Sequence, residues 1–168
     1  MGFSAPSALD FTSAKGELKQ EFAFIASEEA LTCATALGNL LALGGHEEVV
    51  KMFDLKSKRS CGDLSGEHTG SITSVAVTGN HALSASKDGT IMIWRTEDML
   101  PLHTLKVKNV SQVKSLSMHK SQRMCLALYA NGMLRLWNLL DARCIFKKKV
   151  GLIDEEQSSS DNDEEESE

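Results

Sequence analysis

Short runs of alternating apolar and polar residues, each bounded by turn-forming residues, dominate this 168-residue sequence. Four such runs follow one another in its middle part: SITSVAV, HALSAS, TIMIW and LHTLKV, at residues 71–77, 81–86, 90–94 and 102–107. Alternation with period two and β-branched residues is typical of strands. The Asp-Gly pair at residues 88–89, between two such runs, is a strong signal for a hairpin. The pattern therefore predicts four short antiparallel strands.

The same arrangement occurs three times along the chain. An aromatic residue ends the third run of each unit, and these aromatics, 41 and 43 residues apart, are Phe53, Trp94 and Trp137. A polar residue precedes each aromatic by six positions, and these are Glu47, Asp88 and Asn131. Four short strands in a unit of this length are typical of a propeller blade, whereas helical repeats would show helical spacing. We therefore predict an all-β fold of three four-stranded antiparallel blades, an incomplete propeller.

Composition divides the chain into three parts. The predicted domains are a flexible N-terminal segment at 1–20, the blade region at 21–150 and a disordered acidic tail at 151–168. Within the blade region we predict a strand at 21–27 and blades at about 31–65, 68–107 and 110–149. Propellers close with about four to eight blades. Three blades leave open edges, so we expect a truncated or split propeller, or a piece that a partner holds.

The middle unit resembles the WD-repeat family. His68 begins the unit, Asp88 follows 20 residues later in the turn, and Trp94 closes the third strand. The resemblance implies a structural tetrad of hydrogen-bonded side chains, His68, Ser86, Asp88 and Trp94. The chemistry of these groups supports it, because a buried indole N–H needs an acceptor, a hydroxyl relays a bond to an imidazole, and a carboxylate holds the other ring nitrogen.

The outer units depart from this pattern. The first unit has Phe53 and Glu47 in place of the tryptophan and the aspartate. The third keeps Trp137 but has Asn131 in place of the aspartate and Ser111 in place of the histidine. We therefore expect polar bonds to specify only the middle blade, while apolar packing holds the other two.

A narrower resemblance concerns the order of the units. Residues 41–77, 86–107 and 132–151 are similar to the amino-terminal part of the PAK-interacting WD-repeat proteins, which act in large-ribosomal-subunit assembly. Members of that family have more blades than the three predicted here. The resemblance implies a non-enzymatic scaffold for biogenesis of the large (60S-type) subunit, in the nucleus and nucleolus, with pre-ribosomal assembly factors, ribosomal proteins and rRNA as partners. The alternative is a docking inhibitor of a PAK-type kinase, with the cytoplasm as the alternative location.

Charge is distributed unevenly. The net charge is −5, yet nine of the last fifteen residues are acidic, so the rest of the chain is mildly basic. Basic groups occur at residues 56–59, at Lys106 and Lys108, and at residues 146–150, and these clusters either meet rRNA phosphates or are ordinary solvated charge. The acidic tail is either a solubilising end or an arm that binds basic proteins. Ser158 and Ser160 each precede an aspartate by three residues, which makes them phosphorylation candidates.

The rim of the blades supplies the other candidates for partner binding. In WD-repeat proteins the residue before the turn aspartate often faces a partner, and the resemblance places His46, Lys87 and Ala130 there. The candidate partner-binding residues are therefore His46, Lys87, Lys147, Lys148 and Lys149. The alternative is that each is merely exposed.

Several function classes are disfavoured. His68, Ser86 and Asp88 are the residue types of a hydrolase triad, but their tetrad positions favour a structural role, and a hydrolase or enzyme accessory subunit remains the alternative. Gly44-Gly45 lacks the Lys-Ser/Thr of a phosphate loop. The cysteines form no CxxC pair and the histidines do not cluster. We therefore predict no catalytic residues, metal, cofactor, small-molecule substrate or membrane partner.

Overall fold

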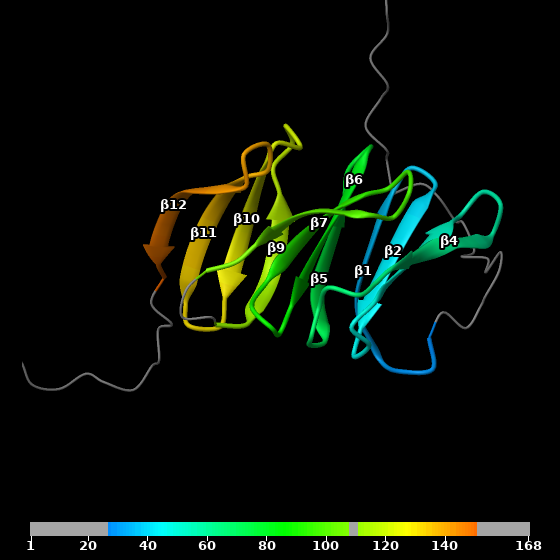
Figure 1. Cartoon of the computed structure of the whole chain (residues 1–168), viewed down its shortest axis with the longest axis horizontal. Coiled ribbons are helices and arrows are strands. Elements are labelled where there is room, and N and C mark those ends of the chain that lie inside the picture. Colours follow the sequence, from blue (N-terminus) through cyan, green and yellow to red (C-terminus); the bar gives the residue numbers. More distant parts are fainter. Residues whose placement is uncertain (1–26, 108–110, 151–168) are drawn as a thin grey trace, which may run out of the picture.

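Every regular element in the described part of the chain is a β-strand. The computed structural model describes residues 27–107 and 111–150, where twelve strands form three antiparallel sheets of four (Figure 1). The predicted all-β fold of three four-stranded antiparallel units is thereby confirmed. The predictions for residues 1–20, for most of the strand at 21–27 and for the tail at 151–168 lie outside the described residues.

Each sheet is a meander in which consecutive strands pair. The first sheet contains β1 (Leu31–Leu37), β2 (Leu40–Gly45), β3 (Val50–Asp54) and β4 (Arg59–Leu64). The middle sheet contains β5 (Ile72–Val77), β6 (His81–Ser86), β7 (Ile91–Arg95) and β8 (Pro101–Leu105). The third contains β9 (Val113–Met118), β10 (Met124–Tyr129), β11 (Met133–Asn138) and β12 (Arg143–Lys149). Among the described residues no helix is long and apolar enough to cross a membrane.

Glycine closes the tight turn between the second and third strands of two sheets. Gly89 has φ 82° and Gly132 has φ 73°, a backbone conformation that residues with a Cβ rarely adopt. The amide of Gly89 donates to the Ser86 carbonyl at 3.1 Å, and that of Gly132 donates to the Tyr129 carbonyl at 3.0 Å. The sequence repeat is therefore a repeat of turn geometry as well.

The three sheets stand in a row, face against face. β5 contacts β1 and β2 on one side and β9 on the other, so the first strands of the sheets are neighbours (Figure 1). A threonine hydroxyl ties each pair together. Thr32 Oγ1 donates to the Ile72 carbonyl at 2.7 Å, and Thr73 Oγ1 donates to the Val113 carbonyl at 2.7 Å. Because these threonines are 41 residues apart, the junction between sheets repeats with the sequence.

Two apolar cores fill the junctions, and the middle sheet contributes to both. The core between the first and middle sheets contains Ala42, Val50, Met52, Leu64, Ile72, Val75, Ala82, Met92 and Trp94. The core between the middle and third sheets contains Ala76, Leu83, Ala85, Ile91, Ile93, Leu105, Val113, Cys125, Ala127, Tyr129 and Trp137. Alternate residues of a strand point to opposite faces, which explains why β6 and β7 are buried almost throughout.

At one position the first and middle sheets lie too close together to leave room for a side chain. A Cβ added at Gly44 would lie 2.4 Å from Cγ2 of Ile72 and 2.9 Å from Sγ of Cys33. Gly44, near the end of β2, is therefore required by packing between neighbouring sheets. At Gly45 a Cβ would instead meet the backbone carbonyl of Ala30, just before β1 of the same sheet.

Candidate functional site

The best-defined polar cluster is a buried hydrogen-bond network in the middle sheet. Its members come from four places: His68 from the loop before β5, Ser84 from β6, Asp88 from the turn after β6, and Trp94 from β7. Trp94 pairs with Ala82 across the two strands, so its indole reaches Ser84, the next residue on that face. The hairpin thus brings together residues that are ten apart in sequence.

The direction of each bond follows from the donors present. Trp94 Nε1 lies 2.7 Å from Ser84 Oγ, and Ser84 Oγ lies 2.7 Å from His68 Nε2. An indole nitrogen can only donate, so the single proton of the hydroxyl is left for the imidazole. His68 therefore accepts at Nε2 and donates from Nδ1, which lies 3.1 Å from both Asp88 Oδ2 and Thr90 Oγ1. Every polar group along this chain of side chains is satisfied.

Asp88 is held from several sides. The Thr90 amide and hydroxyl both donate to Oδ1, at 2.7 and 2.6 Å, and the Thr69 amide donates to Oδ2 at 3.0 Å. Burial raises the pKa of the Asp88 carboxyl, but the bonds from Thr90, Thr69 and His68 outweigh it, so the net pKa lies below the ordinary value. The carboxylate therefore anchors the loop before β5 to the turn between β6 and β7.

The serine of the network is Ser84, and the expected Ser86 was wrong. Ser86 Oγ instead donates to the Gly70 carbonyl at 2.6 Å and accepts from the Asp88 amide at 3.1 Å. Both serines point to the same face, but Ser86 lies one further two-residue step, about 7 Å, from the indole. Counting the hairpin register outward from the Lys-Asp-Gly turn would have identified Ser84.

Ser84, His68 and Asp88 are in the order of a hydrolase triad, so their access to a substrate matters. Ser84 is 0% exposed, and its oxygen already accepts the Trp94 N–H. His68 is only 5% exposed. A nucleophile needs a reacting atom beside it, and this hydroxyl is enclosed by its own partners. The arrangement holds the middle blade together, and Ser86, on which the hydrolase alternative rested, makes no bond to His68 in the structure.

The third sheet carries the same tryptophan without the network. Trp137 pairs with Cys125, so the residue equivalent to Ser84 is Ala127. Trp137 Nε1 and the Tyr129 hydroxyl are buried and make no hydrogen bond of ordinary length and angle among the described residues. Burial raises the pKa of the Tyr129 hydroxyl, and the neighbouring Trp137 N–H lowers it in part, so the two groups lie close to each other. The Arg135 guanidinium lies 5.6 Å from the centre of the Tyr129 ring. The third blade thus satisfies these two buried polar groups less well than the middle blade satisfies Trp94, which costs stability.

The candidate rim residues occupy equivalent places. The backbone amides of His46, Lys87 and Ala130 donate to carbonyls in the loops before the first strands, at 3.0, 3.0 and 2.8 Å. All three side chains are exposed. Their role in binding stays a prediction, and so does that of Ser158 and Ser160, which lie outside the described residues.

The three candidate lysines lie on β12, which is exposed along its whole length. Their side chains do not form one patch. Lys147 and Lys149 pair with Arg135 and Met133, whereas Lys148 pairs with Leu134 and points to the opposite face. Lysines on an edge strand also discourage pairing with another chain. The structure therefore separates Lys148 from its two neighbours.

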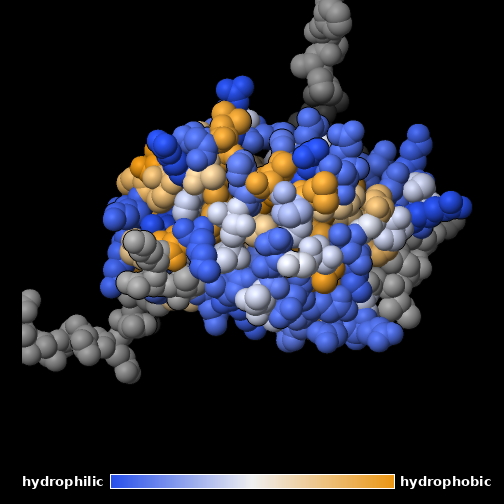
Figure 2. Space-filling view, in the orientation of Figure 1, coloured by the Kyte–Doolittle hydropathy of each residue, from blue (hydrophilic) through white to orange (hydrophobic). Residues whose placement is uncertain are grey.

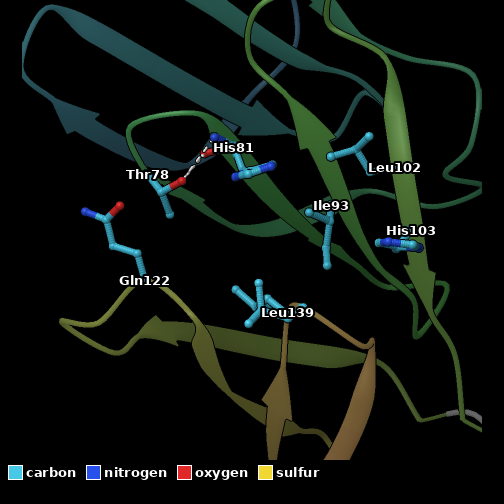
Figure 3. Close-up of a pocket in the computed structure, with 8 residues that line it drawn as sticks. Thr78, His81, Ile93, Leu102, His103, Gln122 and Leu139 are labelled. Atoms are coloured by element: carbon cyan, nitrogen blue, oxygen red, sulfur yellow. Dashed lines mark hydrogen bonds between the residues drawn. The ribbon is translucent and has the colours of Figure 1, made fainter.

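A cavity that the sequence did not indicate lies between the middle and third sheets. It measures about 210 Å³ and is lined by Thr78, His81, Ile93, Leu102, His103, Gln122, Leu139 and Leu140. Figure 3 shows Ile93, Leu102 and His103 on one side, facing Leu139 across the cavity. Thr78 Oγ1 accepts from the His81 amide at 3.0 Å, which closes the adjoining turn. The lining residues come from two units, so only knowledge of the fold could have brought them together.

Comparison with known proteins decides the family. Residues 59–95 match the model described as WD domain, G-beta repeat. This chain belongs to the WD-repeat family. The matched residues include His68, Asp88 and Trp94, so the family match and the buried network coincide.

Several WD-repeat relatives share most of the described region. The chain is 32% identical over 131 residues to "p21-activated protein kinase-interacting protein 1-like" of Xenopus laevis, covering 77% of this chain and 36% of the relative. It is 31% identical over 120 residues to "Shk1 kinase-binding protein 15" of Schizosaccharomyces pombe, covering 70% and 35%. "Protein MAK11" of Saccharomyces cerevisiae is 27% identical, covering 73% and 33%. The chain spans about a third of the length of these relatives.

Solved structures support the fold of this WD-repeat chain. The computationally designed Ika4 protein superimposes with a TM-score of 0.70 at 20% identity, covering 78% of this chain and 80% of that one. The designed Ika8 protein gives a TM-score of 0.64 at 21% identity, covering 71% and 36%. At these identities the likeness concerns the fold alone.

Proposed function

We propose that this WD-repeat chain is a non-enzymatic scaffold that binds assembling large ribosomal subunits in the nucleus and nucleolus. The observation that carries the proposal is that the triad-like polar side chains are buried in the interior, whereas other polar side chains project from the rim. The triad-like side chains of Ser84 and His68 are buried and bonded to one another, whereas His46 and Lys87 project from equivalent turns. The second support is the similarity of the chain to MAK11 and to the kinase-interacting relatives.

The exposed strand β12 supplies the proposed contact with RNA. Lys147, Lys148 and Lys149 present ammonium groups on both faces of an edge strand. Such groups bind phosphates chiefly through charge, so the affinity should fall as salt rises. Because the lysines alternate between faces, they fit two neighbouring segments of RNA backbone better than one flat partner. They would equally fit a phosphate on one face and an acidic protein surface on the other.

The rim supplies the proposed contact with proteins. His46, Lys87 and Ala130 come from successive units and follow one another along one edge of the row of sheets. Assembly factors and ribosomal proteins are the partner class that the resemblance implies. The rim residues differ in size and charge, which is how a repeated scaffold gains specificity for one partner.

A second candidate function is docking to a p21-activated kinase. It is favoured by the names of two relatives, a p21-activated protein kinase-interacting protein 1-like and Shk1 kinase-binding protein 15. In this function the same rim would contact the kinase, and β12 would be free of RNA.

A gradient experiment separates the two candidates. The tagged full chain should co-sediment with large-subunit precursors, and Lys147→Gln/Lys148→Gln/Lys149→Gln should move it toward light fractions. The matched control neutralises three exposed basic side chains elsewhere, Lys114, Lys120 and Arg123, and should leave sedimentation unchanged. Recovery only in light fractions at low salt would contradict the ribosomal role. Pull-down of the chain by a purified p21-activated kinase in that case would favour the second candidate.

A further inference from the structure

Basic side chains gather in the third unit of the chain. Residues 111–150 contain eight lysines and arginines but only one acidic residue, Asp141. The eight are Lys114, Lys120, Arg123, Arg135, Arg143, Lys147, Lys148 and Lys149. None of them pairs with a carboxylate among the described residues, whereas Lys51 in the first unit lies 3.0 Å from Glu47. The third unit therefore carries a large positive charge that no described carboxylate neutralises.

Three of these cations share one face of the third sheet. Lys147 on β12 pairs with Arg135 on β11, and Lys149 on β12 pairs with Met133. Paired residues of antiparallel strands point to the same face, and so do residues two apart on one strand. Arg135, Lys147 and Lys149 therefore lie together, and we call this cluster the basic face. Lys148 pairs with Leu134 and points to the opposite face.

The basic face places like charges directly opposite each other. Such cross-strand pairs destabilise a sheet. Arg135 is half-buried and its guanidinium lies 5.6 Å from the centre of the Tyr129 ring, whereas Lys147 and Lys149 are exposed. Figure 2 shows hydrophilic residues beside hydrophobic ones at the end of the row of sheets where β12 lies. An anion bound between these cations would relieve their repulsion, so the face has the chemistry of a site for carboxylates or phosphates.

The sequence places carboxylates directly after the basic face. The Val150 amide donates to the Gly132 carbonyl at 2.8 Å, which fixes the end of β12 beside the turn between β10 and β11. Residues 151–168, the acidic tail, contain nine acidic residues and no basic one. The first of them, Asp154, comes five residues after Lys149, a span of at most about 17 Å. Lys147 lies about 7 Å further back along the strand, so the acidic tail is long enough to reach the whole face.

We infer that the acidic tail binds the basic face of the same chain through its carboxylates. Because the tail follows β12 directly, its carboxylates are present near the face at an effective concentration on the order of millimolar. A separate acidic molecule would have to reach that concentration to compete. The attraction acts between exposed charges, so it weakens as the salt concentration rises.

The contact would regulate the RNA binding of β12, and this consequence rests on the function proposed above. Carboxylates bound to Lys147 and Lys149 would occupy the ammonium groups offered to phosphates, whereas Lys148 on the opposite face would stay open. RNA would then have to displace the acidic tail, which lowers its affinity. Phosphorylation of Ser158 or Ser160 would add negative charge to the tail and strengthen the contact.

Amide resonances of the full 168-residue chain test the contact in the absence of RNA. Two variants, each with six carboxyl groups converted to amides, are compared with the parent by NMR at low salt. The tail variant is Asp154→Asn/Glu155→Gln/Glu156→Gln/Glu164→Gln/Glu165→Gln/Glu166→Gln. The matched body variant changes six exposed acidic residues outside the tail: Glu28→Gln/Glu29→Gln/Glu48→Gln/Asp63→Asn/Glu67→Gln/Glu97→Gln. The tail variant should shift the amides of Arg135, Lys147 and Lys149, and the body variant should leave them in place.

Fluorescence anisotropy with a labelled single-stranded oligouridine tests the competition. At about 0.1 M salt distant charges are screened. The tail variant should bind about tenfold more tightly than the parent, because no ion pairs have to be displaced. The body variant should bind as the parent does. Adding Lys147→Gln/Lys149→Gln should remove the advantage of the tail variant, whereas the matched change Lys148→Gln should preserve it.

Three results would overturn the inference. The first is a tail variant whose amides at Arg135, Lys147 and Lys149 do not move. The second is an equal shift of these amides in the body variant. The third is a Lys148→Gln change that removes the advantage as fully as Lys147→Gln/Lys149→Gln does. If the amides shift but neither the parent nor the tail variant binds the RNA, the contact is confirmed and the proposed ribosomal function is contradicted.

Discussion

The indole nitrogen of Trp94 donates a 2.7 Å hydrogen bond to the hydroxyl of Ser84, and this contact begins a relay that ends on Asp88. Trp137 occupies the equivalent place in the third sheet and faces Ala127, which has no acceptor on its side chain. Two blades with the same apolar framework thus differ in how their tryptophan is satisfied. The contrast makes the energetic value of the network measurable within one chain.

Ser84→Ala should destabilise the protein by about 1–3 kcal/mol, because it leaves the buried N–H of Trp94 without an acceptor. Urea denaturation followed by tryptophan fluorescence measures the change. Ser115→Ala is the matched control, since Ser115 is an exposed strand serine, and it should stay within about 0.5 kcal/mol of the parent. Equal effects of the two substitutions would contradict the assigned role of Ser84.

His68→Ala should cost about 2–3 kcal/mol, because it removes the acceptor of the Ser84 hydroxyl and the donor to Asp88 at once. Combined with Ser84→Ala, it should cost less than the sum of the single changes, since both break the same relay. A double-mutant cycle in urea gives the coupling free energy. Strict additivity would show that His68 and Ser84 act independently.

Ala127→Ser should stabilise the third blade by about 0.5–1.5 kcal/mol, because the new hydroxyl gives the buried Trp137 N–H an acceptor. The thermal unfolding midpoint should rise accordingly. Ala85→Ser is the control: Ala85 is 0% exposed in the same core, and a hydroxyl placed there should destabilise by about 1–3 kcal/mol. A fall in the midpoint for Ala127→Ser, equal to that of the control, would contradict the prediction.

The lowered pKa of Asp88 predicts a loss of stability in acid. The unfolded carboxyl, with an ordinary pKa of 3.8, binds its proton more readily than the folded one. The stabilisation is therefore complete above pH 3.8 and is lost as the pH falls through the folded pKa. Asp88→Asn should be less stable than the parent at pH 7, and the difference should shrink below pH 3.8.

Thermal melts from pH 7 to pH 2.5 measure this effect. Asp141→Asn, at an exposed position, is the control and should follow the parent curve. A difference between Asp88→Asn and the parent that stays constant through the acid range would rule out the carboxylate as its source.

The sequence predicted the fold because its units repeat period-two patterns and turn residues. Phe53, Trp94 and Trp137 identified the third strand of each unit, and the structure places all three in β3, β7 and β11. His68, Asp88 and Trp94 were also placed correctly in one network. These features are local or depend on a spacing within one unit.

Features that depend on register between strands were harder to predict. Ser84 and Ser86 lie on the same face, and only the pairing of Ala82 with Trp94 distinguishes them. Thr32 and Thr73 bond to carbonyls of a neighbouring sheet, which no pattern within a unit indicates. Contacts between units require knowledge of how the sheets stack.

Because the middle sheet is buried on both faces, the first sheet can bury its apolar face during synthesis only after the middle sheet has been made. The apolar face of the first sheet, with Met52 at its centre, is covered by residues that extend to Trp94. The first 64 residues can form β1–β4, but they cannot bury that face until 30 more have left the ribosome. For that interval the nascent chain carries an uncovered sheet, which is the period in which a chaperone would have to act.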